Sequence, residues 1–139
     1  RVIVSKGPQH EQLALPENMS GAEFLPQTRI LPEVDLVITH GGNNTVTECM
    51  WFGKPMLVLP IFWDQHDNAQ RVHEAGYGLR LPTYALEPDA LVAAVDALLT
   101  DEQLRGRAAA AGERLRRRPG TVAAADLIER VAVTGEPVG

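Results

Sequence analysis

Two short runs of apolar residues, 35–39 and 56–60, constrain the fold of this chain more than any other feature. Neither run alternates apolar and polar residues, as a strand with one solvent-facing side would. Both therefore predict strands that are covered on both faces, which is typical of a parallel sheet. Residues 2–4 predict a further strand, and residues 22–25 and 78–81 predict two weaker ones.

Segments with helical character separate these strands. Asp64 is the expected N-cap of the second helix, and Thr100 with Gln103 forms a capping box that opens the fourth. Pro88 occupies a first helical position, where its missing amide hydrogen costs nothing. The helices expected on these grounds cover residues 45–52, 65–75, 89–99, 100–117 and 121–133.

The alternation of strand and helix predicts an α/β fold. We expect a Rossmann-like open parallel sheet with helices on both faces. One domain is expected over residues 1–133, followed by a flexible tail over 134–139. The chain begins at Arg1, already inside an expected strand and without an initiator Met. We interpret it as part of a longer protein, with the first strand and helix of this domain outside it.

The composition argues against several classes of protein. The formal net charge of −5 disfavours nucleic-acid binding, which requires a basic face. No apolar stretch approaches the roughly 18 residues of a membrane-spanning helix. The one cysteine, Cys49, excludes an internal disulfide and a cysteine-based zinc site. A lone thiol fits the reducing cytoplasm, which is the expected location.

A glycine-rich loop, residues 40–45, follows the strand at 35–39 and precedes a helix. In this geometry backbone amides and the positive end of the helix dipole point at an anion. Gly41 and Gly42 let a ligand approach the backbone, and His40 can donate a hydrogen bond to a phosphate oxygen. The loop is neither a P-loop nor a Gly-x-Gly-x-x-Gly turn. The alternative is a structural turn whose helix is capped by Thr45 and Glu48.

A second polar loop, residues 60–68, follows the other buried strand and therefore faces the same edge of the sheet. Asp64 and Gln65 combine a carboxylate with an amide, a pairing that suits sugar hydroxyls. The alternative makes Asp64 only an N-cap and places Trp63 in the core. A metal held by His40, Asp64 and His66 is not expected, because no ligand spacing supports it.

Six arginines between residues 105 and 118 are the strongest local concentration of charge. Acidic residues interleave with them, and the apolar side of the same helix is accounted for by burial. We therefore expect a solvated basic face that complements the helix dipole, not a nucleic-acid or lipid site. His10 is expected to lie in a solvated loop.

Four segments together resemble the donor-binding signature of the family 1 glycosyltransferases of the GT-B fold, the UDP-glycosyltransferases and their antibiotic-modifying bacterial relatives. The resemblance rests on order and spacing, since any one segment alone is weak. It identifies the chain as similar to the C-terminal half of such an enzyme. The segments are residues 24–27, 40–48, 53–56 and 64–69.

The resemblance implies a role for each matching residue. Phe24 would stack on the nucleobase, Leu25 would bond the base edge through its backbone, and Gln27 would lie near base and ribose. The diphosphate positions are His40, Gly42, Asn43, Asn44 and Thr45, the ribose position is Glu48, and the sugar positions are Asp64 and Gln65. Phe24 stands where the family usually has Trp, so UDP and dTDP both remain open. Asn43 and Asn44 make the loop a hybrid of plant and bacterial patterns.

The resemblance also implies the reaction. A hexose would pass with inversion, and without a metal or other cofactor, from a UDP- or dTDP-sugar to a hydroxyl of a small natural-product-like acceptor. A base in the N-terminal acceptor domain, outside this chain, would take the proton, so the fragment alone would bind donor without turnover. The alternatives are a non-catalytic nucleotide-sugar-binding module and a hydrolytic relative such as a 2-epimerase. Asp64 and Gln65 argue against the epimerase.

Overall fold

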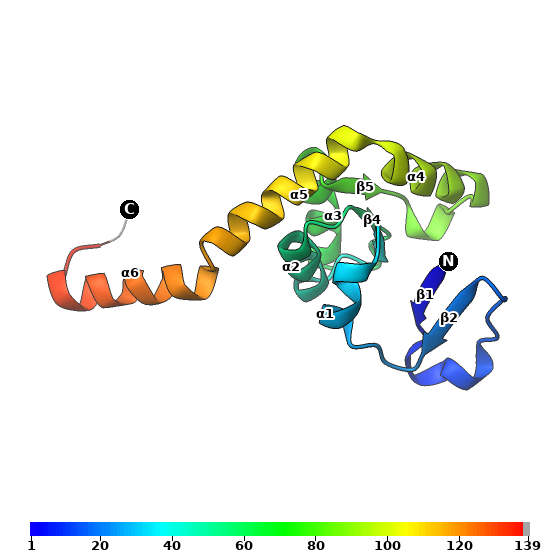
Figure 1. Ribbon diagram of the computed structural model, residues 1–139, viewed down its shortest axis with the longest axis horizontal. Coiled ribbons are helices and arrows are strands. Elements are labelled where there is room, and N and C mark those ends of the chain that lie inside the picture. The colour runs from blue at the N-terminus through cyan, green and yellow to red at the C-terminus, as the bar shows by residue number, and fades with distance from the viewer. Residues whose placement is uncertain (138–139) are drawn as a thin grey trace. The chain divides into compact units, whose positions relative to one another are not determined.

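Two parallel sheets organise the chain, one in each of two compact units. The computed structural model describes residues 1–137, and the division falls between Glu33 and Val34. The first unit contains a two-stranded sheet, and the second contains three strands in the order β3-β4-β5 (Figure 1). All pairs are parallel, which confirms the predicted Rossmann-like α/β class.

In the first unit, β1 (Val2–Ser5) pairs with β2 (Met19–Ala22). The prediction of a strand over 22–25 was therefore wrong by three residues. The reason is strand pairing. β1 ends at Ser5, which pairs with Ala22, so residues 23–25 have no strand to pair with. The short helices η1 (Gly7–Gln12), α1 (Gln27–Ile30) and η2 (Leu31–Glu33) complete this unit.

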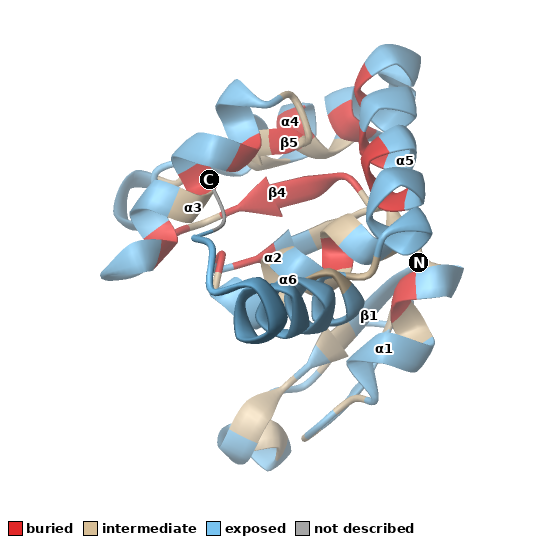
Figure 2. Ribbon diagram, turned by 90° about the vertical axis from the view of Figure 1, so that its left-hand side faces the viewer, coloured by how far each residue is buried: buried red, intermediate tan, exposed pale blue. Residues whose placement is uncertain are grey.

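The second unit is built around β4 (Met56–Val58), which lies between β3 (Val37–Thr39) and β5 (Gly78–Arg80). Every residue of β4 is completely buried (Figure 2). Because successive side chains of a strand point to opposite faces, burial of the whole strand requires cover on both faces. The apolar run at 56–60 predicted this correctly. The same expectation was wrong for β3, whose Ile38 is 49% exposed at the edge of the sheet.

Helices supply that cover. The central leucine of β4, Leu57, packs in a core cluster with Ala94 and Leu98 of α4 (Pro88–Thr100) and with Leu104 of α5 (Glu102–Arg117). The helix α3 (Asp64–Glu74) packs against β5, and α2 (Asn43–Phe52) packs against α5. A short helix η3 (Thr83–Ala85) follows β5.

The final helix, α6 (Gly120–Thr134), has no buried residue. Gly135 is its C-cap and adopts a left-handed conformation with φ 68°. The helix therefore runs one residue beyond its predicted end. Of the tail predicted over 134–139, residues 138 and 139 lie outside the described part of the chain. No helix within residues 1–137 combines the length and apolar character needed to cross a bilayer.

Three exposed arginines of α5 also contact neighbouring helices. Arg105 donates to the carbonyl of Leu99, at the end of α4, and Arg107 donates to the carbonyl of Gly76, just past α3. Arg116 donates to the carbonyl of Trp51, in the last turn of α2. The last carbonyls of a helix lack intrahelical partners, and cationic donors satisfy them. All three side chains are nevertheless exposed, so the prediction of a solvated face holds for them, and the helix-end contacts were not predicted.

Two predicted N-caps each lie one residue away from the observed N-cap. The N-cap of α3 is Trp63, not Asp64. Asp101, not Thr100, caps α5, and its carboxylate accepts a hydrogen bond of 2.9 Å from the amide of Leu104. The hydroxyl of Thr100 instead donates to the carbonyl of Asp96 inside α4. Thr100 and Asp101 are adjacent, and both suit an N-cap. Because α4 includes Thr100, Asp101 is the residue that caps α5.

Adjacent leucines in α4 test the assignment of the core. Leu98 is fully buried, whereas Leu99 is 36% exposed. We expect Leu98→Ala to lower the free energy of unfolding by about 2–5 kcal/mol, because it leaves a cavity under the sheet. Leu99→Ala on the same helix should cost at most about 1 kcal/mol. Urea unfolding followed by circular dichroism measures both, and equal losses would contradict the assigned core.

Candidate functional site

The carboxyl ends of β3 and β4 carry the two polar loops that the sequence singled out. His40 follows β3 directly, and the loop from Leu59 to Trp63 joins β4 to α3. The side chain of Asn68 on α3 ties the two loops together. Its Nδ2 donates to the carbonyl of Gly41 at 2.9 Å and to Oδ1 of Asn43 at 2.9 Å. The structure thus brings the predicted phosphate loop and the predicted sugar loop into one site.

Asn68 is the positioning residue that sequence reasoning left without a role. Besides its two bonds to the glycine loop, its Nδ2 lies 3.2 Å from Oδ2 of Asp64, one turn earlier in α3. One amide nitrogen, with two hydrogens, is therefore shared among three acceptors. The signal in the sequence is the spacing of four residues from Asp64, which places both side chains on one face of the helix.

The glycine at position 41 is required by the backbone. Its φ is 87°, a region that other residues rarely adopt, and a Cβ atom would lie 2.7 Å from Cγ1 of Val58 in β4. The Gly41 amide donates to Oγ1 of the buried Thr39 at 3.2 Å. The loop therefore rests directly on the end of the central strand, where a side chain would lift it away.

At Gly42 the close contact is with a side chain and not with the backbone. Its φ of −64° suits any residue, but a Cβ atom there would lie 2.7 Å from Nε2 of His40. The imidazole therefore lies over the Cα of Gly42, which is the N-cap of α2 and has no side-chain cap. This places a ring nitrogen beside the positive end of the helix dipole. The alternative start of the helix at a Thr45–Glu48 capping box was wrong, because α2 begins at Asn43.

The remaining predicted residues of the glycine loop lie in the first two turns of α2. Asn43 and Asn44 are exposed at its N-terminus, and Thr45 and Glu48 are half-buried. Next to Glu48, Cys49 is fully buried. Burial, with a smaller contribution from the Glu48 carboxylate, raises the pKa of the Cys49 thiol to about 12. The thiol is therefore neutral at physiological pH and packs as an apolar side chain.

Gln65 shapes the second loop from within. It is 5% exposed, and its Oε1 accepts hydrogen bonds from the amides of Ile61 at 2.9 Å and Phe62 at 3.2 Å. Both lone pairs of that oxygen are then used, so Gln65 can serve a ligand only as a donor through Nε2. Asp64 is exposed and is the first residue of α3, not its N-cap, because the Gln65 side chain organises this turn.

Trp63 occupies the N-cap position of α3 with φ 52° and ψ −133°. Its side chain is 83% exposed, so the alternative that placed it in the core was wrong. The ring meets Phe62 edge to face, with centroids 5.1 Å apart and planes at 86°. An exposed aromatic ring on a left-handed backbone directly precedes the predicted sugar-binding pair.

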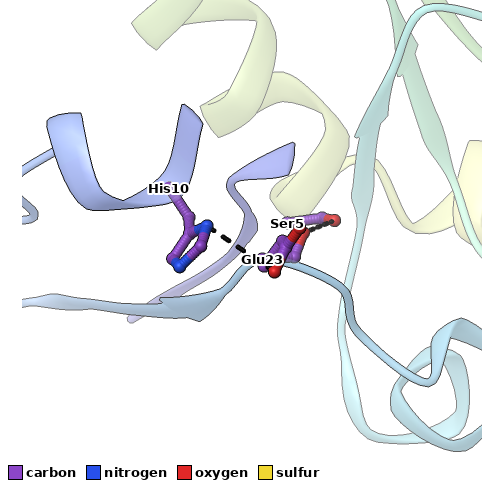
Figure 3. A network of polar contacts seen from close by, with 3 residues as sticks. All are labelled: Ser5, His10 and Glu23. Carbon is purple, nitrogen blue, oxygen red and sulfur yellow. Dashed lines mark hydrogen bonds and ion pairs between the residues drawn. The ribbon is translucent and has the colours of Figure 1, made fainter. Parts of the chain in front are cut away.

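The predicted base-binding residues belong to the first unit, which is described separately. Phe24 is 72% exposed, Leu25 is half-buried, and Gln27 begins α1. The preceding residue, Glu23, is held in place (Figure 3): its carboxylate lies 3.7 Å from Nδ1 of His10, and its carbonyl accepts from Ser5 Oγ at 3.4 Å. His10 lies in η1 and faces Glu23, so the prediction of a solvated loop was wrong for it.

Metal-ligating side chains do not gather in this site. Within residues 1–137, no group of three His, Cys, Asp or Glu side chains lies close enough together to hold a metal ion.

Comparison with known proteins agrees with this architecture. Residues 2–129 match the family described as erythromycin biosynthesis protein CIII-like, C-terminal domain. The chain is 38% identical over 130 residues to a zeaxanthin glucosyltransferase of Pantoea ananas, covering 94% of this chain and 30% of that protein. Among curated relatives of this kind the chain therefore spans about a third of the length or less.

Solved structures show the same relation. The glycotransferase of kitacinnamycin superposes with a TM-score of 0.82 at 35% identity, over 92% of this chain and 34% of that one. Glycosyltransferase VinC, solved in complex with dTDP, superposes with a TM-score of 0.77 at 28% identity, over 88% of this chain and 31% of that one.

The fold is that of the C-terminal domain of GT-B glycosyltransferases. The chain belongs to the erythromycin biosynthesis protein CIII-like C-terminal domain family, a family of glycosyltransferase C-terminal domains.

Two glycine-to-alanine substitutions distinguish the close packing of the glycine loop from ordinary helix propensity. Gly41→Ala should lower the free energy of unfolding by about 2–4 kcal/mol, because it adds both a positive-φ penalty and an overlap with Val58. Gly106→Ala, inside α5 with nothing within 4 Å of the new Cβ, should stabilise by about 0.5–1 kcal/mol. Thermal unfolding of both variants checks this, and a neutral Gly41→Ala would refute the close packing of the loop.

Proposed function

We propose that this chain is the donor-binding domain of an inverting glycosyltransferase. The enzyme transfers a hexose from a UDP- or dTDP-sugar to a hydroxyl of a small natural-product-like acceptor. One observation carries the proposal: the Asn68 side chain joins the glycine loop at the N-terminus of α2 to the exposed carboxylate of Asp64 at one edge of the sheet. The two loops match the chemistry of a diphosphate linked to a sugar.

The diphosphate lies at the N-terminus of α2. The first amides of a helix have no intrahelical acceptor, and the dipole favours an anion there. The His40 ring, which lies over Gly42, adds a donor on the side of the β3 strand. The side chains of Asn43, Asn44 and Thr45 border the same end of the helix. Together these groups stabilise the charge that grows on the leaving diphosphate.

The sugar lies against the start of α3. Asp64 accepts from sugar hydroxyls, and Gln65 donates through Nε2, since its oxygen holds the loop amides. Asn68 Nδ2 donates to Oδ2 of Asp64 at 3.2 Å, so the carboxylate that accepts from the sugar hydroxyls is oriented before the sugar arrives. Glu48 binds the ribose, and Phe24, Leu25 and Gln27 bind the base in the manner that the family resemblance implies.

The transfer itself balances without a group from this domain taking the proton. The acceptor oxygen forms a bond to the anomeric carbon, the bond from that carbon to the phosphate oxygen breaks, and the nucleoside diphosphate leaves with the electron pair. A base outside this chain removes the hydroxyl proton. The names of the relatives support the substrate classes: zeaxanthin is a hydroxylated apolar natural product, and VinC was solved with dTDP.

Replacing the histidine tests the diphosphate site. His40→Ala should weaken the binding of UDP or dTDP by about 1.5–3 kcal/mol, because it removes a hydrogen bond to a charged group. His73→Ala is the matched control, since His73 is an exposed residue in the last turn of α3. Isothermal titration measures both. Equal affinity of the two variants would return His40 to a structural role.

Nucleotide binding should not depend on a divalent metal. The helix N-terminus supplies positive partial charge, and the His40 ring supplies a hydrogen-bond donor, in the place that a cation takes elsewhere. Titration of the chain with UDP or dTDP should therefore give the same dissociation constant with EDTA as with magnesium. Incubation with donor and a hydroxylated acceptor should yield no glycoside. Loss of binding in EDTA would refute the metal-free site, and product formation would refute a base outside the chain.

A further inference from the structure

A cluster of exposed apolar side chains adjoins the proposed sugar position. We call it the aromatic platform, and it consists of three consecutive loop residues and one residue of η3. Trp63 is 83% exposed, Tyr84 81%, Phe62 48% and Ile61 42%. None of the four carries a charge. The aromatic platform ends at the peptide bond that links Trp63 to Asp64.

The aromatic platform is held firmly although it faces solvent. Gln65 fixes the amides of Ile61 and Phe62 from inside the loop. The Tyr84 hydroxyl donates to the carbonyl of Ile61 at 3.2 Å, and the hydroxyl of the neighbouring Thr83 donates to the carbonyl of Pro60 at 2.6 Å. Rigid aromatic surface of this kind gives contact area at little entropic cost on binding.

The backbone of Trp63 gives the second argument. Trp63 is the only residue other than glycine with positive φ within residues 1–137. At φ 52° and ψ −133° a glycine would be free of strain, whereas a tryptophan is not. The ring lies outside the core, and the ring it contacts, that of Phe62, is itself 48% exposed. Such strain concentrates where a side chain serves a ligand.

We propose that the aromatic platform binds the acceptor, with Trp63 stacking on the flat, apolar body of a hydroxylated molecule. The inference rests on the proposed function, because it takes the sugar to lie at Asp64. An attacking hydroxyl must come within about 3–3.5 Å of the anomeric carbon. Because Trp63 directly precedes Asp64, we place the body of the acceptor against its exposed ring. The uncharged surface selects an aromatic or conjugated acceptor over a polyol.

The two tryptophans of the chain allow a residue-resolved test. Trp63 belongs to the aromatic platform, whereas Trp51 lies on α2 and is 36% exposed. We expect 2-naphthol, added to the ¹⁵N-labelled chain saturated with UDP-glucose, to shift the indole resonance of Trp63 in a saturable manner. The resonance of Trp51 should stay unchanged. Trp63→Phe and Trp51→Phe assign the two signals, and myo-inositol serves as the polyol control.

Variants at Trp63 separate binding from folding. Trp63→Gly should weaken 2-naphthol binding about three- to tenfold, as expected for loss of an aromatic contact. Its thermal midpoint should equal or exceed that of the wild type, because glycine relieves the strain. Trp63→Phe should retain most of the binding. A lower midpoint in Trp63→Gly would instead assign the ring a structural role and overturn the proposal.

The remaining outcomes are also decisive. Equal shifts of both indoles, or equal responses to 2-naphthol and myo-inositol, would show non-specific adsorption and overturn the aromatic platform. Naphthol binding unaffected by Trp63→Gly would do the same. The donor site is read independently in the same spectra, from the UDP-dependent shifts of the Asn43 and Asn44 amides. Absence of those shifts refutes the proposed function, whereas their presence without a Trp63 response refutes only the acceptor platform.

Discussion

The amide of Asn68 is the contact on which the site depends. It spans from α3 to the glycine loop and bonds the Gly41 carbonyl, the Asn43 side chain and the Asp64 carboxylate. Two neighbouring parallel strands place their carboxyl ends at one edge, but that alone fixes neither loop relative to the other. The side-chain amide of Asn68, shared among three acceptors, does so. The proposed phosphate and sugar positions are thereby set by one side chain that needs to touch neither ligand.

Beneath this contact lies the complete burial of β4. Gly41 lies close both to Val58 of β4 and to the backbone of Gln65, so the two loops meet at the end of one buried strand. Strained or glycine-dependent backbone persists only where the surroundings over-determine it. The buried strand and its helices provide that constraint. The arginines of α5 add to it, since they join the ends of α2, α3 and α4 to one helix.

The sequence predicted the parts of the fold that depend on local pattern. The uninterrupted apolar run at 56–60 marked the central strand, and the position of two polar loops after buried strands placed them together. It failed where tertiary pairing decides: β2 ends where β1 ends, and Asp101 caps α5 although Thr100 is as good a capping residue. The left-handed Trp63 was beyond prediction, because that conformation is expected only of glycine. The role of Asn68 needed coordinates, since its partners lie 25 and 27 residues away.

Strain and preorganisation are two aspects of the same loop. The sequence predicted that Gln65 binds the sugar. In the structure its Oε1 atom accepts hydrogen bonds from two backbone amides, so this oxygen shapes the loop and only Nε2 remains for a ligand. In return, the loop is ordered before any ligand arrives, and the entropy of ordering it is not lost on binding. The loop therefore keeps its rigidity in the main chain and presents an exposed ring directly before Asp64. If the proposed acceptor contact holds, substitution at position 63 changes which acceptor is preferred, while the Asn68 contact stays intact.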